Sequence, residues 1–84
     1  MEGEKEAMSY SVDTVELKKR MIEQGFDTIG ELAEKSGVGR DTVSGVVNGK
    51  IRPSTAVMEK IMIALNMKPK DAGVIFFSPN LRNT

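Results

Sequence analysis

The sequence predicts an all-α domain of five short helices. Apolar residues recur at spacings of three and four, which is the pattern of a helix with one buried face. Most of the candidate helices begin at a capping side chain or a proline. No segment shows the strict apolar–polar alternation of a half-buried strand. The chain has 84 residues, enough for one domain with a single small core.

The first helix is predicted over about residues 13–24. Asp13 is a favourable N-cap, and Glu16 three positions later can complete a reciprocal capping box. Gly25 suits the left-handed conformation that ends many helices. The residues expected to face inward are Leu17 and Met21, with Ile22 beside them.

The second helix is predicted over about residues 28–36, opened by a capping box of Thr28 and Glu31. Gly37 then makes a tight turn, and Val38 is expected to plug into the core. The inward residues of this helix are Leu32 and the small Ala33, which lets a neighbouring helix approach closely.

The third helix is predicted over about residues 40–48 and has a poor intrinsic propensity. Thr42 and the β-branched valines disfavour it, and Gly45 costs about 1 kcal/mol relative to alanine. Tertiary packing must therefore hold this helix, as expected for a helix selected for what it contacts. Its apolar positions are Val43, Val46 and Val47, and Asn48-Gly49 ends it.

Two further helices complete the predicted fold. Ser54 is a natural cap for a helix over about 55–65, and Asn66 can serve as its left-handed end. Pro69 suits the first turn of a fifth helix that runs to about Phe77. The inner positions of the fourth helix are Val57, Ile61, Ala64 and Leu65, broadened by Met58 and Met62.

The expected organisation is one helical domain over 13–77, a mobile extension over 1–12 and a tail over 78–84. The end of the fifth helix is too apolar for a free segment, so it either folds back on the core or meets a second copy. The residues assigned tentatively to a homodimer interface are Val74, Ile75, Phe76 and Phe77.

The composition argues against several classes of function. Histidine and cysteine are both absent, which removes the commonest general base and the commonest neutral and thiolate metal ligands. We therefore expect no enzyme, no metal, no cofactor and no small-molecule substrate. No apolar run is long enough to cross a membrane, and the acidic N-terminus lacks a secretory signal, so the expected location is the cytoplasm.

Net charge is a point against nucleic-acid binding, because twelve bases balance twelve acids. The charges are nevertheless unevenly distributed. Residues 40–52 contain three basic side chains and one acidic side chain, Asp41, so this segment has a local net charge of +2. We expect a local basic patch with modest non-specific affinity for DNA.

The stretch from Thr28 to Gly49 resembles the helix-turn-helix of the phage-repressor (Cro/Xre-type, lambda-repressor-like) family, and the likeness spans roughly residues 14–66. The matching elements are Thr28-x-x-Glu31-Leu32-Ala33, Ser36-Gly37-Val38, Thr42-Val43-Ser44, Asn48-Gly49-Lys50, Pro53-Ser54 and Ile61-x-x-Ala64-Leu65. The resemblance implies a prophage-type repressor that binds double-stranded DNA as a homodimer, with its third helix in the major groove.

By this resemblance, the candidate DNA-binding residues are Thr28, Arg40, Asp41, Thr42, Ser44, Asn48, Lys50 and Arg52. Arg40 could bond a guanine in a bidentate manner, Asp41 could accept from a cytosine amino group, and Ser44 could meet a base. Thr42 and Asn48 match positions that usually meet phosphates, and the charges that follow the helix suit the same role.

Simpler interpretations of these residues stay open. Arg40 could be a solvated surface charge, with or without a pairing to Asp41, and Asp41 could cap the third helix or orient Arg40. Ser44 could be inert, and Lys50 and Arg52 could be ordinary loop charges. The basic run at residues 18–20 could contact the DNA backbone, although we favour the interpretation that these side chains form a solvent-exposed face of the first helix.

The sequence departs from the family pattern in three places. Ile29 stands where the family often has a glutamine, Gly45 stands where a long side chain is frequent, and the loop 25–27 looks one residue longer. These departures predict fewer polar contacts, or a DNA site recognised partly through its shape. They also leave open an alternative, a helix-turn-helix used for protein contact in an antirepressor or antitoxin-like subunit.

Overall fold

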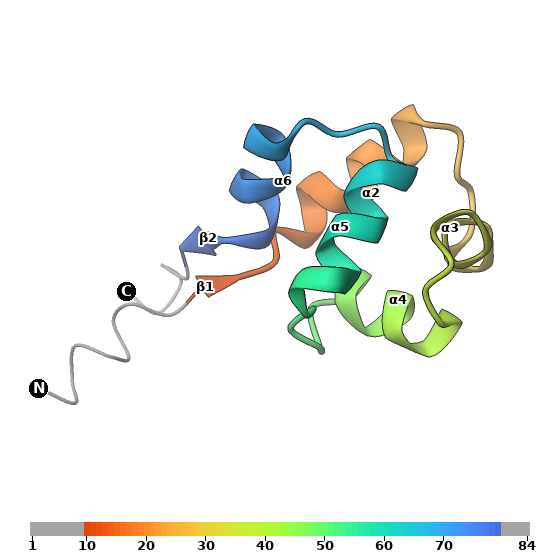
Figure 1. Cartoon of the computed structure of the whole chain (residues 1–84), viewed down its shortest axis with the longest axis horizontal. Helices are drawn as coiled ribbons and strands as arrows, with labels where there is room; N and C mark the ends of the chain where they lie inside the picture. The colour runs from red at the N-terminus through yellow and green to blue at the C-terminus, as the bar shows by residue number, and fades with distance from the viewer. Residues whose placement is uncertain (1–9, 80–84) are drawn as a thin grey trace, which may run out of the picture.

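The computed structural model describes residues 10–79, which form five helices and a pair of very short strands (Figure 1). In chain order the elements are β1 (Tyr10–Ser11), α2 (Thr14–Glu23), α3 (Ile29–Ser36), α4 (Arg40–Val47), α5 (Thr55–Ala64), α6 (Pro69–Phe76) and β2 (Ser78–Pro79). The predicted all-α fold of five helices is confirmed, and each helix begins and ends within about one residue of its predicted limits.

The helix starts follow from their capping side chains. Thr28 Oγ1 accepts from the backbone N–H of Glu31 at 3.1 Å, and the Glu31 carboxylate accepts from the N–H of Thr28 at 3.3 Å, so the predicted capping box is complete. Ser54 caps α5 in the predicted way, accepting from Val57 N at 3.2 Å. Local sequence therefore determines where these helices begin.

The cap of α2 is only half of the predicted box. Asp13 Oδ1 accepts from Glu16 N at 3.1 Å, but the Glu16 carboxylate instead accepts from Arg20 Nε at 3.3 Å. Arg20 also lies 3.6 Å from a carboxylate oxygen of Asp71 and 4.0 Å from one of Glu23. The hydrogen bond that Arg20 donates to the Glu16 carboxylate raises the pKa of Arg20, and the negative charges of Asp71, Glu16 and Glu23 raise it further. Arg20 thus helps to join α2 to α6.

The core lies where the helices meet, and the predicted stripes supply most of it. Leu32, Val43 and Ile61 are fully buried, and α3 contacts both α4 and α5. Ile22 was expected beside this core, but its side chain is 72% exposed. The reason is geometric: Leu17 and Met21 are four residues apart and take the narrow buried stripe of α2, whereas position 22 turns outward.

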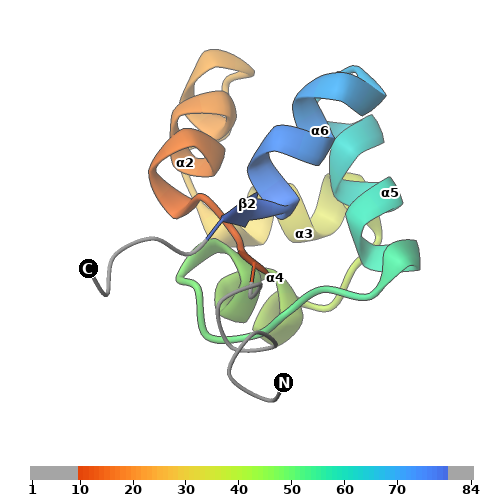
Figure 2. The same cartoon turned by 90° about the vertical axis from the view of Figure 1, so that its left-hand side faces the viewer.

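The two strands are the feature that the sequence did not predict. β1 and β2 pair antiparallel, with Tyr10 opposite Pro79 and Ser11 opposite Ser78. The rings of Tyr10 and Phe77 meet edge to face with centroids 6.5 Å apart. The ordered fold therefore begins before residue 13 and continues past residue 77, while the rest of the expected extension and tail lies outside the described residues. Figure 2 shows this pair beside α2 and α6.

Helix α6 divides the apolar segment at its end between the core and the surface. Ile75 and Phe76 fold back into the core, with 1% and 4% of their surfaces exposed. Val74 and Phe77 are 64% and 51% exposed. Of the four residues assigned to a dimer interface, only these two offer a large surface to a second copy. Within residues 10–79, no helix combines the length and apolarity that a membrane span requires.

Candidate nucleic-acid interface

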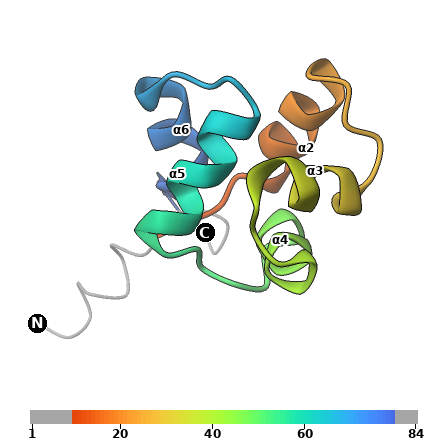
Figure 3. The same ribbon diagram turned by 45° about the vertical axis from the view of Figure 1, so that its right-hand side comes forward.

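The structural unit of the candidate interface is α3, a tight turn and α4. Gly37 ends α3 in the left-handed conformation, at a φ of 77°, which a residue without Cβ adopts at little cost. Ser36 Oγ accepts from the N–H of Val38 at 3.2 Å, and Val38 is buried as predicted. Figure 3 shows α3 and α4 side by side, with the loop after α4 leading to α5.

The buried and exposed faces of α4 are sharply separated. Its three valines are buried against the rest of the domain, at 0–2% exposure. Asp41, Gly45 and Asn48 are spaced by four and three residues, so they share one face, opposite the valines. Arg40 and Ser44 flank this face on one side. We call the surface formed by residues 40, 41, 44, 45 and 48 the outer face of α4.

Arg40 stands at the start of α4 with its side chain exposed to solvent. Its guanidinium makes no hydrogen bond or ion pair with Asp41 or with any other of residues 10–79. Arg40 is therefore an exposed charge without the pairing to Asp41 that the simpler interpretation allowed. Asp41 does not cap α4 either, because the N-cap is Gly39 and no side chain bonds the first amide groups of the helix.

The side chains of Thr28 and Arg40 both border Gly30, although they lie twelve residues apart. A Cβ atom added at Gly30 would lie 3.9 Å from Arg40 Nε and 3.9 Å from Thr28 Oγ1. The Thr28 oxygen already accepts from Glu31 N, but its hydroxyl hydrogen still can donate to an anion. The amino-terminal ends of α3 and α4 thus bring a hydroxyl and a guanidinium close to one another.

Ser44 and Asn48 are linked at the other end of the outer face. Asn48 Nδ2 donates to the backbone oxygen of Ser44 at 2.9 Å and to its hydroxyl at 3.4 Å. The backbone N–H of Asn48 donates to the same Ser44 oxygen at 3.0 Å, so the side chain adds a second donor to this carbonyl at the end of α4. Thr42 is half-buried beside Gly39, so it lies at the margin of the outer face.

The two bases after α4 have different environments. Lys50 is exposed, and its backbone N–H donates to Gly45 O at 2.7 Å. Arg52 Nη2 donates to the backbone oxygen of Tyr10 at 2.7 Å, which links the loop after α4 to β1. Arg52 is therefore not simply a solvated loop charge. A guanidinium has five N–H donors, so several others are available for a second partner such as a phosphate.

Ile51 is a residue of this surface that the sequence reasoning missed. Its side chain lies against Gly45 and is 43% exposed. Two features of the sequence could have drawn attention to Ile51. It stands between the bases Lys50 and Arg52, and the preceding helix has a glycine, Gly45, in its middle. The glycine was noted as a departure from the family pattern, but its partner could not be identified from spacing alone.

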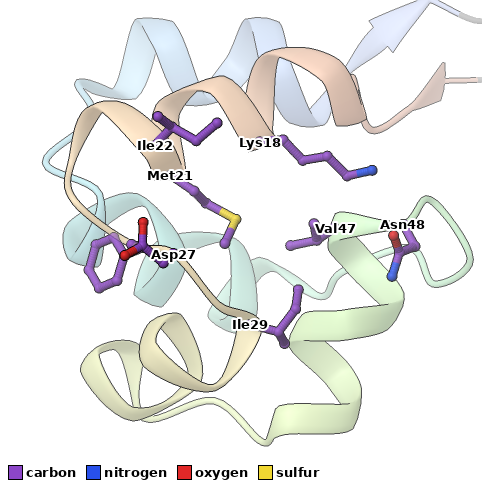
Figure 4. A pocket seen from close by; sticks show the side chains of 8 residues that line it. Lys18, Met21, Ile22, Asp27, Ile29, Val47 and Asn48 are labelled. Carbon is purple, nitrogen blue, oxygen red and sulfur yellow. The ribbon is translucent and has the colours of Figure 1, made fainter.

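A hollow of about 360 Å³ lies beside the carboxyl end of α4 (Figure 4). Its wall includes Met21 and Ile29 from α2 and α3, with Val47 and Asn48 from α4. Lys18 extends from α2 over this end of α4. Of the basic run on α2, Lys18 thus borders the candidate interface, whereas Arg20 is held among carboxylates toward α6.

Comparison with known proteins agrees with this geometry. No curated protein and no solved structure matches the chain. A family model, described as the Cro/C1-type HTH DNA-binding domain, matches residues 16–75, which include all five helices except the first residues of α2 and the last of α6. The match covers well over half of the sequence and contains the whole helix-turn-helix. The chain therefore belongs to the Cro/C1-type helix-turn-helix DNA-binding family.

Proposed function

We propose that this protein is a sequence-specific, double-stranded-DNA-binding regulator of transcription, of the prophage repressor type, that inserts α4 into the major groove. The observation that carries the proposal is the exposed guanidinium of Arg40 at the start of a helix held from behind by buried valines. A major groove admits one α-helix, and residues near the amino-terminal end of that helix contact base edges.

The charges around α4 support the same function. Between residues 40 and 52 the chain carries three bases, Arg40, Lys50 and Arg52, and one acid, Asp41, and Lys18 extends toward the end of α4 from α2. Contacts of these bases with phosphates would release counterions, so affinity should fall as salt rises. Because the whole chain carries no net charge, we expect weak binding to random DNA and a marked preference for a specific site.

The proposal is tested by binding the protein to fragmented genomic DNA, sequencing what it retains and measuring affinity for those fragments at several salt concentrations. We expect a shared sequence among retained fragments and a salt-sensitive affinity for it. If no fragment is enriched and no binding responds to salt, DNA recognition is refuted. A helix-turn-helix that contacts proteins would then be the better description.

We expect Arg40→Ala to lower affinity for the specific site by about 1–3 kcal/mol, because a bidentate arginine–guanine pair contributes that much discrimination. The variant should also tolerate more bases at the position that Arg40 contacts. Titration of labelled site and random DNA measures both effects. Lys70→Ala, an exposed base on α6, is the matched control and should change neither. Equal weakening on both DNAs would instead make Arg40 a phosphate contact.

We also propose that the protein acts as a homodimer through the exposed end of α6. Val74 and Phe77 are exposed there, and Phe77 borders a groove of about 320 Å³ between α5 and α6. A two-fold pair of such surfaces would present two copies of α4 to two half-sites.

Phe77→Ala should therefore lower the average mass of the protein in sedimentation at micromolar concentration, because it removes exposed apolar surface from the proposed contact. Ile22→Ala is the control and should leave the mass unchanged, because Ile22 is an apolar residue of α2 that is even more exposed, at 72% against 51% for Phe77. If the mass is the same with and without Phe77, this surface is not the dimer interface.

A further inference from the structure

The centre of the outer face of α4 is covered by an aliphatic side chain from the loop that follows it. A Cβ atom added at Gly45 would lie 2.5 Å from Cγ1 of Ile51 and nearer still to its Cδ1, which is closer than carbon atoms can approach, and 3.1 Å from its Cβ, which is a tight contact. Ile51 therefore occupies the space that a side chain at position 45 would take. Helix α4 has a glycine there because another residue already fills the position.

Ile51 is held in place by its neighbours. The N–H groups of Lys50 and Ile51 both donate to the carbonyl of Gly45, at 2.7 and 3.1 Å. On the other side, Arg52 donates to Tyr10 O at 2.7 Å. The loop is thus fixed to α4 before Ile51 and to β1 after it. A side chain fixed in this way loses little conformational entropy when it makes a contact.

The surroundings of Ile51 indicate what it contacts. Gly45 shares its face with Asp41 and Asn48, and the exposed Lys50 directly precedes Ile51 in the chain. Toward β1, Ile51 borders a hollow of about 180 Å³ whose wall also includes Tyr10 and Val12. Toward α4, Ile51 is the exposed aliphatic side chain beside the polar residues of the outer face. A basic surface with one apolar point matches a DNA major groove, where phosphates surround the bases and the C5-methyl group of thymine is the one apolar group on the base edges.

We infer that Ile51 is a specificity-determining residue that contacts the C5-methyl group of a thymine. The inference rests on the proposed function and adds a chemical requirement to it. The preferred site contains a thymine opposite the middle of α4, and recognition of that thymine depends on its methyl group. Gly45 is a positioning residue in this arrangement, because it provides the space in which Ile51 lies.

The experiment starts from a site selected by the protein from random DNA sequences. Each thymine of that site is replaced in turn by deoxyuridine, which removes the methyl group and leaves the hydrogen-bonding groups unchanged. At one position, deoxyuridine should lower the affinity of the unmodified protein about 3- to 5-fold, which is the effect of burying one methyl group. The same replacement should not affect Ile51→Ala. Ile63→Ala, an exposed isoleucine on α5, is the control and should keep the methyl effect.

A second variant is needed because Ile51→Ala could lose the methyl effect simply by disturbing the structure of the loop. Gly45→Ala retains Ile51 but displaces it, so the methyl effect should disappear while the preference for the base contacted by Arg40 remains. If no thymine methyl group affects the unmodified protein, or if its effect persists in both variants, the inference is wrong although sequence-specific binding stands. If no preferred site can be selected at all, the proposed function fails, and the role of Ile51 with it.

Discussion

Leu32→Ala should lower the free energy of unfolding by about 2–5 kcal/mol, the range observed when a buried leucine is truncated and a cavity remains. Leu32 is completely buried and is the residue of α3 that is buried among its neighbours in α4 and α5. A domain of ordinary stability has about 5–15 kcal/mol in total, so this one change removes a large share. Urea unfolding monitored by circular dichroism measures the effect.

Ile63→Ala provides the control, because Ile63 is 68% exposed and lies on α5 outside the core. We expect it to change the free energy of unfolding by less than about 0.5 kcal/mol. A loss for Ile63→Ala as large as that for Leu32→Ala would mean that the helices pack through different faces. The arrangement of α3, α4 and α5 described above would then be wrong.

Gly45→Ala and Gly73→Ala should change stability in opposite directions, although both replace a glycine inside a helix. A Cβ atom at Gly73 meets nothing within 4 Å, so alanine should stabilise α6 by up to about 1 kcal/mol. At Gly45 the new atom collides with Ile51. Overpacking of this kind costs about 1–3 kcal/mol, which exceeds the gain in helix propensity. We therefore expect Gly45→Ala to be destabilising.

The cause can be isolated with a double-mutant cycle. In the Ile51→Ala background, the atoms that collide most closely with position 45 are gone, so Gly45→Ala should become nearly neutral or stabilising. The coupling between the two positions should be about 1–3 kcal/mol, measured from the four free energies of unfolding. Additive effects would contradict the contact between Gly45 and Ile51. A stabilising Gly45→Ala by itself would show that Ile51 moves aside at little cost.

The sequence predicted the local features of the fold because each depends on residues close together in the chain. The cap at Thr28 and its partner Glu31 are three residues apart, and so are Ser54 and the amide that it caps. The left-handed positions at Gly25, Gly37 and Asn66 follow from the same kind of local information. The valines of α4 were predicted to be buried because helical spacing alone places them on one face.

Interactions between distant segments could not be predicted in this way. The strands β1 and β2 have two residues each, too few to show an alternating pattern, and they pair from opposite ends of the chain. Arg52 was expected to face phosphates, and only the structure brings it to Tyr10 O, 42 positions away. The divided role of α6 also depends on how that helix is rotated against α2 and α5.

The candidate interface shows the same division. The sequence by itself determined that residues 40–48 form an amphipathic helix with Arg40 at its exposed start, because helical periodicity and turn chemistry are local properties. Only the tertiary structure decided what covers the centre of that helix. Gly45 weakens α4 when it is considered alone, yet in the folded protein it makes room for Ile51, since van der Waals exclusion acts between whatever atoms the fold brings together.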